Sequence, residues 1–257
     1  MTAIETIALP ARRLKWKLAV VRDIVVESHR VNSVLLQVDN WQRQLPGQHV
    51  DIRLTAEDGY QAQRSYSIAS PPEDDLLALT VELVEDGEVS PYLVCDLHVG
   101  DRFELRGPIG GYFVWTAATQ GPLWLIAGGS GIAPLMAMLR HRVRRKLRTP
   151  TLLLYSSRSV QDIIYRTELD AIEHSDPNLR VVNTLTREQP AGWMGRRGRI
   201  CRALLAELGF PPRQRPNIFV CGPTPFVEDV SRYLVSLGYD PPLIKTERFG
   251  PSGRETV

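Results

Sequence analysis

The first half of the chain carries short apolar runs separated by turn residues. The runs are rich in Val, Ile, Leu, Tyr and Phe, and Gly, Pro, Asn, Asp or Ser stands between them, which is typical of β-strands joined by turns. One short helix is expected in "SPYLVCDL", because Ser90 suits an N-cap and Pro91 suits the first helical position. The pattern predicts an antiparallel barrel. Its six strands are expected at residues 17–26, 33–39, 49–54, 64–70, 77–84 and 101–110.

The second half alternates strand-type and helix-type segments. Strands are expected at residues 122–128, 151–157, 179–186 and 217–222. Helices are expected at residues 133–147, 162–174, 200–208 and 225–238. This βαβα order is typical of a parallel sheet covered by helices on both faces. The change of pattern predicts two domains, over residues 1–118 and 119–257, the second of which ends in a C-terminal tail.

Composition excludes several classes of protein. The 257 residues suffice for two domains that each bury a core. No apolar stretch approaches the roughly 18 residues of a membrane span, and the N-terminus lacks the order of a signal peptide, so a cytoplasmic location is expected. The cysteines are too far apart for a disulfide framework, a zinc site or an iron-sulfur site, and no metal is expected. They are Cys95, Cys201 and Cys221.

Charge is distributed unevenly between the two halves. Residues 1–116 contain 11 Lys or Arg and 17 Asp or Glu, whereas residues 117–257 contain 20 and 12, so the halves carry −6 and +8 charges. A basic half can attract nucleic acid, an acidic protein or a phosphate-rich small molecule. Nucleic-acid binding by the basic half is the non-enzyme alternative. However, the arginines of this half are dispersed, and it has no helix-turn-helix or RNA-binding aromatic signature.

A glycine-rich turn stands between the first strand and the first helix of the second half. In "LIAGGSGIAP", Gly129, Gly131 and Pro134 form a G-x-G-x-x-P pattern where dinucleotide folds keep G-x-G-x-x-G. Glycines there permit close approach by a pyrophosphate, whose charge is stabilised by free amides at a helix N-terminus. A P-loop is excluded, because no Lys-Ser or Lys-Thr follows. An ordinary strand-to-helix connection is the alternative.

The first half offers a second set of candidate ligand-binding residues. On the expected strand "QRSYSIAS", alternation puts Arg64 and Tyr66 on one face and Ser67 on the other. An arginine pairs with phosphate, an aromatic ring packs against a planar ring, and a hydroxyl hydrogen-bonds a ring nitrogen. "DGEVSPYL" adds Gly87 and Ser90 at the start of the short helix, a second potential anion site. Two anion sites in one chain indicate two nucleotides.

The order of these motifs resembles that of the ferredoxin-NADP reductase superfamily over nearly the whole chain. Four segments carry the resemblance: R-x-Y-S at residues 64–67, "GEVS" at 87–90, "GGSGIAP" at 128–134 and "VCGPTPFVEDV" at 220–230. The resemblance implies a flavin-binding, six-stranded Greek-key barrel followed by a nucleotide-binding α/β domain, without a fused iron-sulfur domain. It also implies hydride transfer from NAD(P)H to flavin, and electron transfer to a separate acceptor such as ferredoxin or flavodoxin. A reductase subunit feeding an oxidase, oxygenase or molybdoenzyme is the alternative.

The resemblance also assigns roles to individual residues. Arg64 is expected to pair with the flavin pyrophosphate, Tyr66 to pack against the isoalloxazine, and Ser67 to hydrogen-bond near the reactive flavin nitrogen. Further flavin-site residues are Val81, Gly87, Val89 and Ser90. Nucleotide-site residues are Gly128, Gly129, Ser130, Gly131, Cys221, Gly222 and Pro223. The expected catalytic residues are Ser67, Cys221, Glu247 and Phe249, and a plain core thiol is the alternative for Cys221.

The choice between related cofactors rests on fewer residues. Arg158, Arg187 and Arg199 resemble family arginines around an adenosine 2′-phosphate, and no acidic residue directly ends the strand before Arg158, so NADPH is preferred over NADH. FAD is preferred over FMN, because the helix at Ser90 can serve a pyrophosphate.

Two further segments have alternative interpretations. Glu247 and Phe249 resemble a family tail that reaches the flavin and the nicotinamide, and a flexible tail without function is the alternative. Under the first interpretation, deleting residues 247–257 alters the rate of hydride transfer or the nucleotide preference while flavin stays bound. The basic run at residues 139–150 either docks an acidic acceptor protein or is the solvated end of a helix, where positive charge suits the dipole.

Overall fold

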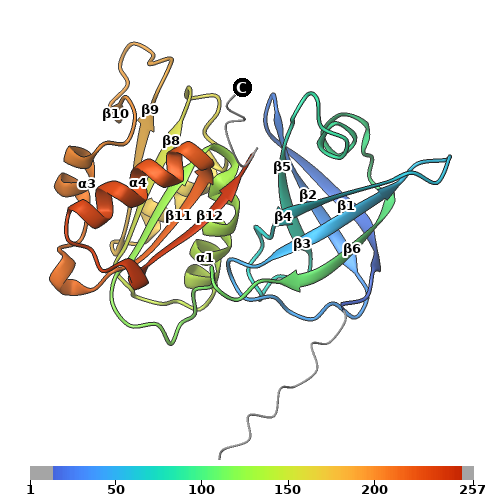
Figure 1. Cartoon of the computed structure of the whole chain (residues 1–257), viewed down its shortest axis with the longest axis horizontal. Coiled ribbons are helices and arrows are strands. Elements are labelled where there is room, and N and C mark those ends of the chain that lie inside the picture. The colour runs from blue at the N-terminus through green and yellow to red at the C-terminus, as the bar shows by residue number, and fades with distance from the viewer. Residues whose placement is uncertain (1–13, 251–257) are drawn as a thin grey trace, which may run out of the picture.

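The structure is a computed structural model that describes residues 14–250, and it shows two domains side by side (Figure 1). The first is a six-stranded antiparallel sheet in the order β4-β3-β6-β1-β2-β5. A bridge between Ile68 and Leu79 joins the two edges of this sheet, which confirms the predicted barrel. The strands are β1 (Lys17–Ser28), β2 (Val31–Val38), β3 (His49–Thr55), β4 (Gln61–Ser67), β5 (Leu77–Glu82) and β6 (Arg102–Ile109).

The short helix after β5 differs from the expectation. It is a π-helix over Tyr92–Asp96 (η1), and no side chain caps it. The hydroxyl of Ser90 instead accepts a hydrogen bond from the amide of Val84 at 3.0 Å. The predicted N-cap is therefore wrong, and Ser90 closes the preceding loop.

The second domain is a six-stranded parallel sheet in the order β10-β9-β8-β7-β11-β12. The alternating pattern predicted the parallel sheet and four of its strands, and it missed β10 and β12. The strands are β7 (Leu123–Gly128), β8 (Thr151–Ser157), β9 (Leu179–Leu185), β10 (Arg196–Arg197), β11 (Asn217–Pro223) and β12 (Ile244–Phe249). The α-helices are α1 (Ile132–Arg144), α2 (Arg166–Ser175), α3 (Arg202–Leu208) and α4 (Thr224–Ser236). Three 3₁₀ turns are η2 (Gly129–Gly131), η3 (Pro212–Gln214) and η4 (Pro241–Leu243). No helix within residues 14–250 is long and apolar enough to cross a membrane.

Helices cover both faces of this sheet. On one face α1 and α2 pack on a core that includes Leu125 and Leu153. On the other face α3 and α4 pack on a core that includes Ile126 and Leu154. The first of these cores also contains Val31 and Ala78 of the barrel and the completely buried Trp115 from the connection between the domains, so it joins the two domains. The domain boundary at residues 118 and 119 stays a prediction.

The C-terminal segment forms an element that the sequence pattern did not predict. Residues 244–249 are the strand β12, which pairs in parallel with β11. Glu247 lies opposite Cys221, and Phe249 lies opposite Pro223. A flexible tail is therefore wrong for this segment, and residues 251–257 lie outside the described residues. Deletion of residues 247–257 would remove half of β12, so it does not isolate a role in hydride transfer.

The basic run at the end of α1 is bound within the molecule. Four of its side chains meet carboxylates of this chain: Arg140 with Glu168, His141 with Glu73, Arg142 with Asp176 and Arg144 with Asp74. Glu73 and Asp74 belong to the β4–β5 connection of the barrel domain, so His141 and Arg144 join the two domains. These four side chains therefore have acidic partners within the chain, and docking of an acceptor protein through the basic run stays a prediction.

Tyr165 joins the domains through a ring of buried hydrogen bonds. Its hydroxyl bonds the hydroxyl of Thr80, which lies 2.8 Å from the hydroxyl of Ser33. Ser33 donates to one oxygen of Glu27 at 2.7 Å, and the Tyr165 amide donates to the other oxygen at 3.2 Å. Tyr165 has a φ of 59°, a left-handed conformation that costs about 1–2 kcal/mol. These bonds hold that conformation, and α2 consequently begins at residue 166 rather than at 162.

Replacing Tyr165 by phenylalanine is expected to lower the free energy of unfolding by about 1–2 kcal/mol, because it removes a buried hydrogen bond between the domains. Tyr112→Phe is the control, since the hydroxyl of Tyr112 also bonds across the domains, to the carbonyl of Ile244 at 3.3 Å, but its side chain is exposed. We expect the control to change stability by less than about 0.5 kcal/mol. Urea denaturation of both variants checks this, and equal losses would contradict it.

Candidate functional site

A crevice lies at the carboxyl ends of the central strands of the parallel sheet. β7 has β8 on one side and β11 on the other, and α1 and α4 lie on opposite faces of the sheet. In open parallel sheets, ligands bind beyond the carboxyl ends of strands at such a switch point. A cavity of about 400 Å³ opens there, and Gly128, Gly129, Ser130 and Pro223 contribute to its wall.

The glycines around this crevice serve two different purposes. A Cβ on Gly131 would lie 2.7 Å from the amide nitrogen of Gly222, and a Cβ on Gly222 would lie 2.6 Å from the ring of Phe226. A Cβ on Gly128 would lie 3.1 Å from the same ring. These three glycines therefore let the turn, β11 and Phe226 pack together. Gly129 differs, because its φ is +55° and no atom lies within 3.9 Å of the Cβ position, so its surface is open to the cavity.

Glu82 is a cavity residue that the sequence analysis missed. It is the last residue of β5 in the barrel, and its carboxylate accepts a hydrogen bond from the hydroxyl of Ser130 at 2.6 Å. The glycine turn is thus joined to the barrel by a charged group. No local motif marks Glu82, because its importance depends on the packing of one domain against the other.

The three arginines expected near a 2′-phosphate differ in their relation to the cavity, although the amide of Arg187 donates to the carbonyl of Arg158 at 2.9 Å. Arg158 and Arg199 line the cavity, and Arg187 does not. Arg158 and Arg199 are exposed, and neither forms an ion pair with any other residue of the described part of the chain. Two free guanidinium groups therefore stand in the wall of the cavity.

On the barrel, Arg64 pairs with the "GEVS" segment. Its guanidinium donates to Glu88 at 2.6 Å, and Tyr60 donates to the other oxygen of the same carboxylate. Hydrogen bonds from Tyr60 and Arg64 lower the pKa of Glu88. Tyr66 is half-buried against the barrel core, and burial raises its pKa to about 12, so it stays a neutral ring at physiological pH.

The remaining residues expected at the flavin contribute through the backbone or the loop. The side chains of Val81 and Val89 are buried in the barrel core, so they can meet a ligand only through backbone atoms. The amide of Gly87 donates to the carbonyl of Val84 at 2.9 Å, and Ser90 bonds the same residue. The "GEVS" segment is thus a closed loop in the described structure.

Two strand pairings and one side-chain contact connect residues across the seam, the boundary between the barrel and the parallel sheet. His49 is the β3 residue opposite Ser67 of β4. Its Nδ1 lies 3.9 Å from Oε1 of Glu247, and Glu247 lies opposite Cys221 on β11. Three expected catalytic residues are therefore connected through His49, which the sequence analysis missed because no motif surrounds it.

Burial controls the charges in this chain of residues. Burial raises the pKa of Glu247 to about 7, and its Oε2 is buried without a hydrogen-bond partner. Burial lowers the pKa of His49, although Asp51 opposes the shift. Burial and the nearby Glu247 carboxyl raise the pKa of Cys221 well above its usual range. In mildly acidic solution Glu247 therefore holds its proton, so it does not form an ion pair with His49.

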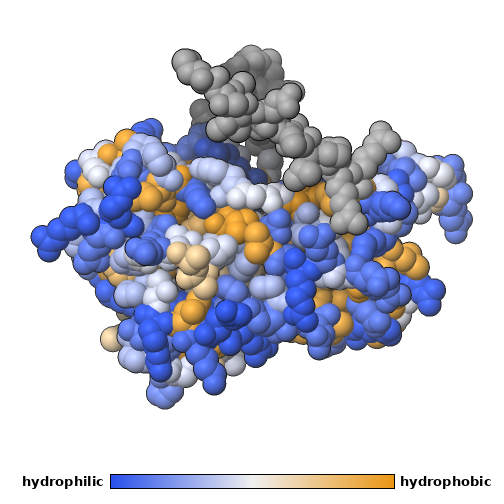
Figure 2. Space-filling view, turned by 90° about the horizontal axis from the view of Figure 1, so that it is seen from below, coloured by the Kyte–Doolittle hydropathy of each residue, from blue (hydrophilic) through white to orange (hydrophobic). Residues whose placement is uncertain are grey.

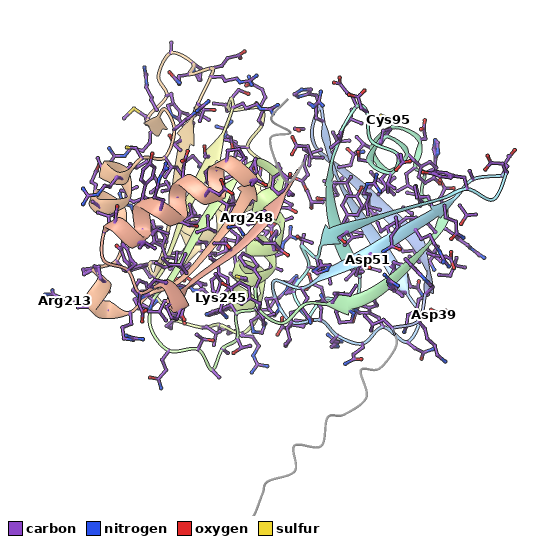
Figure 3. All side chains as sticks on the ribbon, in the orientation of Figure 1. Asp39, Asp51, Cys95, Arg213, Lys245 and Arg248 are labelled. Atoms are coloured by element: carbon purple, nitrogen blue, oxygen red, sulfur yellow. The ribbon has the colours of Figure 1, made fainter. Side chains whose placement is uncertain are left out.

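Alternation along β12 decides which of its side chains reach the seam. Lys245 donates to the carbonyl of Val114, Glu247 faces His49, and Phe249 lines the cavity. Arg248, labelled with Lys245 in Figure 3, is exposed. The strand thus presents its odd-numbered residues to the barrel and the cavity.

Two family models match the two halves of the chain. The model described as oxidoreductase FAD-binding domain matches residues 18–114, and the model described as oxidoreductase NAD-binding domain matches residues 125–232. NADH-cytochrome b5 reductase 1 of Kluyveromyces lactis is 30% identical over 197 residues, which cover 76% of this chain and 69% of that protein. The chain belongs to the ferredoxin-NADP reductase superfamily.

Two further proteins illustrate the range of the superfamily. The glycine betaine monooxygenase reductase subunit of Chromohalobacter salexigens is 35% identical over 208 residues, and the match spans 80% of this chain and 56% of that subunit. The FAD/NAD-binding domain of a nitric oxide dioxygenase from Vibrio cholerae superposes with a TM-score of 0.82 at 27% identity, covering 91% of this chain and 99% of that chain. This chain thus contains an oxidoreductase FAD-binding domain and an oxidoreductase NAD-binding domain.

The residues present fit both cofactors of the superfamily. At the crevice, the open surface of Gly129 and the free guanidinium groups of Arg158 and Arg199 suit a dinucleotide with phosphate groups. At the seam, half-buried Tyr66 offers an apolar ring face, and Glu247 has an unpartnered buried oxygen. Both features suit a planar redox ring between the barrel and β12.

Proposed function

We propose that the chain transfers hydride from NADPH to FAD and passes electrons to a separate acceptor protein. When bound, the flavin accepts the hydride and releases electrons singly. The observation that supports this most directly is the seam, where Ser67, His49, Glu247 and Cys221 connect the barrel to the end of β11. Two rings bound from opposite domains would meet there, shielded from water by the surrounding side chains.

Roles for this chain's residues follow from their positions. Arg64 now pairs with Glu88 of the "GEVS" loop. It would exchange this carboxylate for the flavin pyrophosphate, or bind both at once. Ser67 would hydrogen-bond the flavin ring, and Tyr66 and Phe249 would pack against ring faces. Cys221, Gly222 and Pro223 would border the nicotinamide through the end of β11. Glu247 would hold a proton at Oε2, where no other group of the described chain bonds it.

Nucleotide preference is proposed from the cavity wall. Arg158 and Arg199 stand free of carboxylates, which favours the 2′-phosphate of NADPH. The side chain of Arg187 is exposed and does not line the cavity, but its backbone adjoins Arg158, so rotation of the side chain would bring it to the same phosphate. NADH is the second candidate, since the similar protein of Kluyveromyces lactis is an NADH-cytochrome b5 reductase.

The acceptor is proposed to be a ferredoxin or flavodoxin. The alternative is a component of a larger oxygenase, oxidase or molybdoenzyme, and the similarity to a monooxygenase reductase subunit favours an oxygenase within that group. On the face seen in Figure 2, hydrophobic residues form small areas between hydrophilic ones. Such a face favours a transient, partly polar contact rather than a permanent interface.

Anaerobic mixing with each nucleotide tests this proposal. The purified protein is expected to be yellow, to release FAD rather than FMN on denaturation, and to lose its flavin absorbance on mixing. NADPH is expected to act at lower concentration than NADH, because only NADPH offers a phosphate to Arg158 and Arg199. Subsequent addition of ferredoxin or flavodoxin is expected to restore the absorbance. A colourless protein that binds DNA in a salt-sensitive manner would instead support the nucleic-acid alternative.

A further inference from the structure

The hairpin between β1 and β2 belongs to the barrel but forms part of the wall of the nucleotide cavity. Ser28, Arg30 and Val31 line the cavity together with Gly128 and Ser130 of the other domain. In Figure 1 this hairpin is the blue loop at the top of the barrel, beside the gap between the domains. A ligand in the crevice therefore meets side chains from both domains.

Arg30 is the cation of this hairpin, and its hydrogen bonding is incomplete. One guanidinium nitrogen donates to Glu85 at 2.6 Å, and another donates to the carbonyl of Leu83 at 3.0 Å. The third nitrogen, Nε, is buried and has no partner within the described residues. Arg30 lines the cavity, and buried donors are normally satisfied, so its covered and unpartnered Nε indicates that a small rotation of the guanidinium would gain an acceptor.

The position of Arg30 indicates which part of a dinucleotide supplies that acceptor. The Leu83 amide donates to the carbonyl of Arg30 at 2.8 Å, and Val31 lies opposite Glu82 in the barrel. Glu82 in turn accepts the hydrogen bond from Ser130 in the glycine turn. Arg30 is thus near the turn that faces a pyrophosphate, where the carboxylate of Glu82 would otherwise repel the ligand.

We propose that Arg30 is a binding residue for the pyrophosphate of the pyridine nucleotide, so that the nucleotide is held by both domains. This rests on the proposed function of the crevice. The guanidinium would turn its Nε toward a phosphate oxygen and offset the charge of Glu82 at the same time. Because NADH and NADPH share the pyrophosphate, Arg30 acts on both, unlike a residue that contacts the 2′-phosphate.

The competing interpretation is that Arg30 only holds the hairpin through Glu85 and Leu83. The two interpretations predict different effects for Glu85→Gln. If Arg30 is structural, weakening its bond to Glu85 harms the hairpin in the same direction as losing Arg30 itself, so both substitutions would raise KM. If Arg30 binds phosphate, Glu85→Gln keeps the positive charge of Arg30 and removes the carboxylate that competes with the phosphate for it.

Steady-state kinetics of the flavin-loaded enzyme with ferricyanide as acceptor separate these interpretations. Arg30→Gln is expected to raise KM for NADPH and for NADH by about tenfold, with kcat within about twofold and flavin content unchanged. Glu85→Gln is expected to leave both KM values unchanged or to lower them. Arg22→Gln is the matched control, since Arg22 is an arginine of β1 that bonds Gln37 and does not line the cavity.

Three results would overturn the proposal. An increase of KM in Glu85→Gln as well as in Arg30→Gln would assign Arg30 to the hairpin alone. An increase for NADPH but not for NADH would place Arg30 at the 2′-phosphate. An unchanged KM in Arg30→Gln, with flavin still reduced normally, would remove Arg30 from the site. Failure of the proposed function is distinguishable, because in that case the unsubstituted protein itself would not be reduced by either nucleotide.

Discussion

Replacing Gly131 by alanine is expected to lower the free energy of unfolding by about 3 kcal/mol and to slow flavin reduction. The new Cβ would lie 2.7 Å from the amide nitrogen of Gly222 and nearer still to the carbonyl oxygen of Cys221. Both atoms belong to the backbone of β11, so no side chain can rotate away to make room. The glycine turn would have to move off β11, and the nucleotide surface at Gly129 would move with it.

Gly111→Ala is the matched control for this substitution. Gly111 is exposed, and a Cβ there would meet no atom within 4 Å. The control is expected to keep the stability of the unsubstituted protein within about 0.5 kcal/mol. Urea denaturation gives the stability, and stopped-flow absorbance gives the rate of flavin reduction. A Gly131→Ala protein as stable as the control would show that the turn does not depend on its approach to β11.

Replacing Glu247 by glutamine is expected to stabilise the protein above neutral pH by about 3 kcal/mol and to leave it unchanged near pH 4. Burial raises the pKa of Glu247 from an ordinary 4.5 to about 7. A carboxyl that holds its proton more tightly when folded adds stability below pH 4.5, and that contribution is lost as the pH rises through 7. Glutamine resembles the protonated acid at every pH, so it escapes this loss.

The measurement is the free energy of unfolding at several pH values for both proteins. The difference between them is expected to grow from about pH 4.5 to about pH 7 and to level off above that. Glu188→Gln is the control, because Glu188 is exposed and its replacement is expected to give a pH profile parallel to that of the unsubstituted protein. Parallel profiles for Glu247→Gln as well would mean that Glu247 titrates normally in the folded protein.

Elements with a strong local pattern were predicted almost to the residue. The strand β8 spans Thr151–Ser157, as expected, because a buried parallel strand is a continuous apolar run bounded by polar residues. The glycine turn was placed correctly between β7 and α1, because few residues other than glycine suit that connection. The antiparallel barrel followed from short runs separated by turns.

Elements that depend on distant partners were predicted less well. The segment "IKTERF" has no marked apolar run, and it becomes β12 because β11 offers an unpaired edge. The start of α2 is displaced because Thr80 and Glu27 of the barrel hold Tyr165. The sequence shows the basic end of α1 without its partners. The ion pairs with Glu73 and Asp74 depend on the packing of the barrel against α1.

The sequence by itself determined the antiparallel barrel, the alternating strands and helices of the second domain, and the glycine turn. It also determined which residue types can bind phosphate and planar rings, because all of these depend on neighbours within a few positions. Only the tertiary structure decided that Glu82 and Arg30 of the barrel face the glycine turn, and that His49 meets Glu247 at the seam. These contacts join residues from different domains, and no local periodicity records them. Burial at the seam, which sets the charge of Glu247, likewise exists only once both domains are packed together.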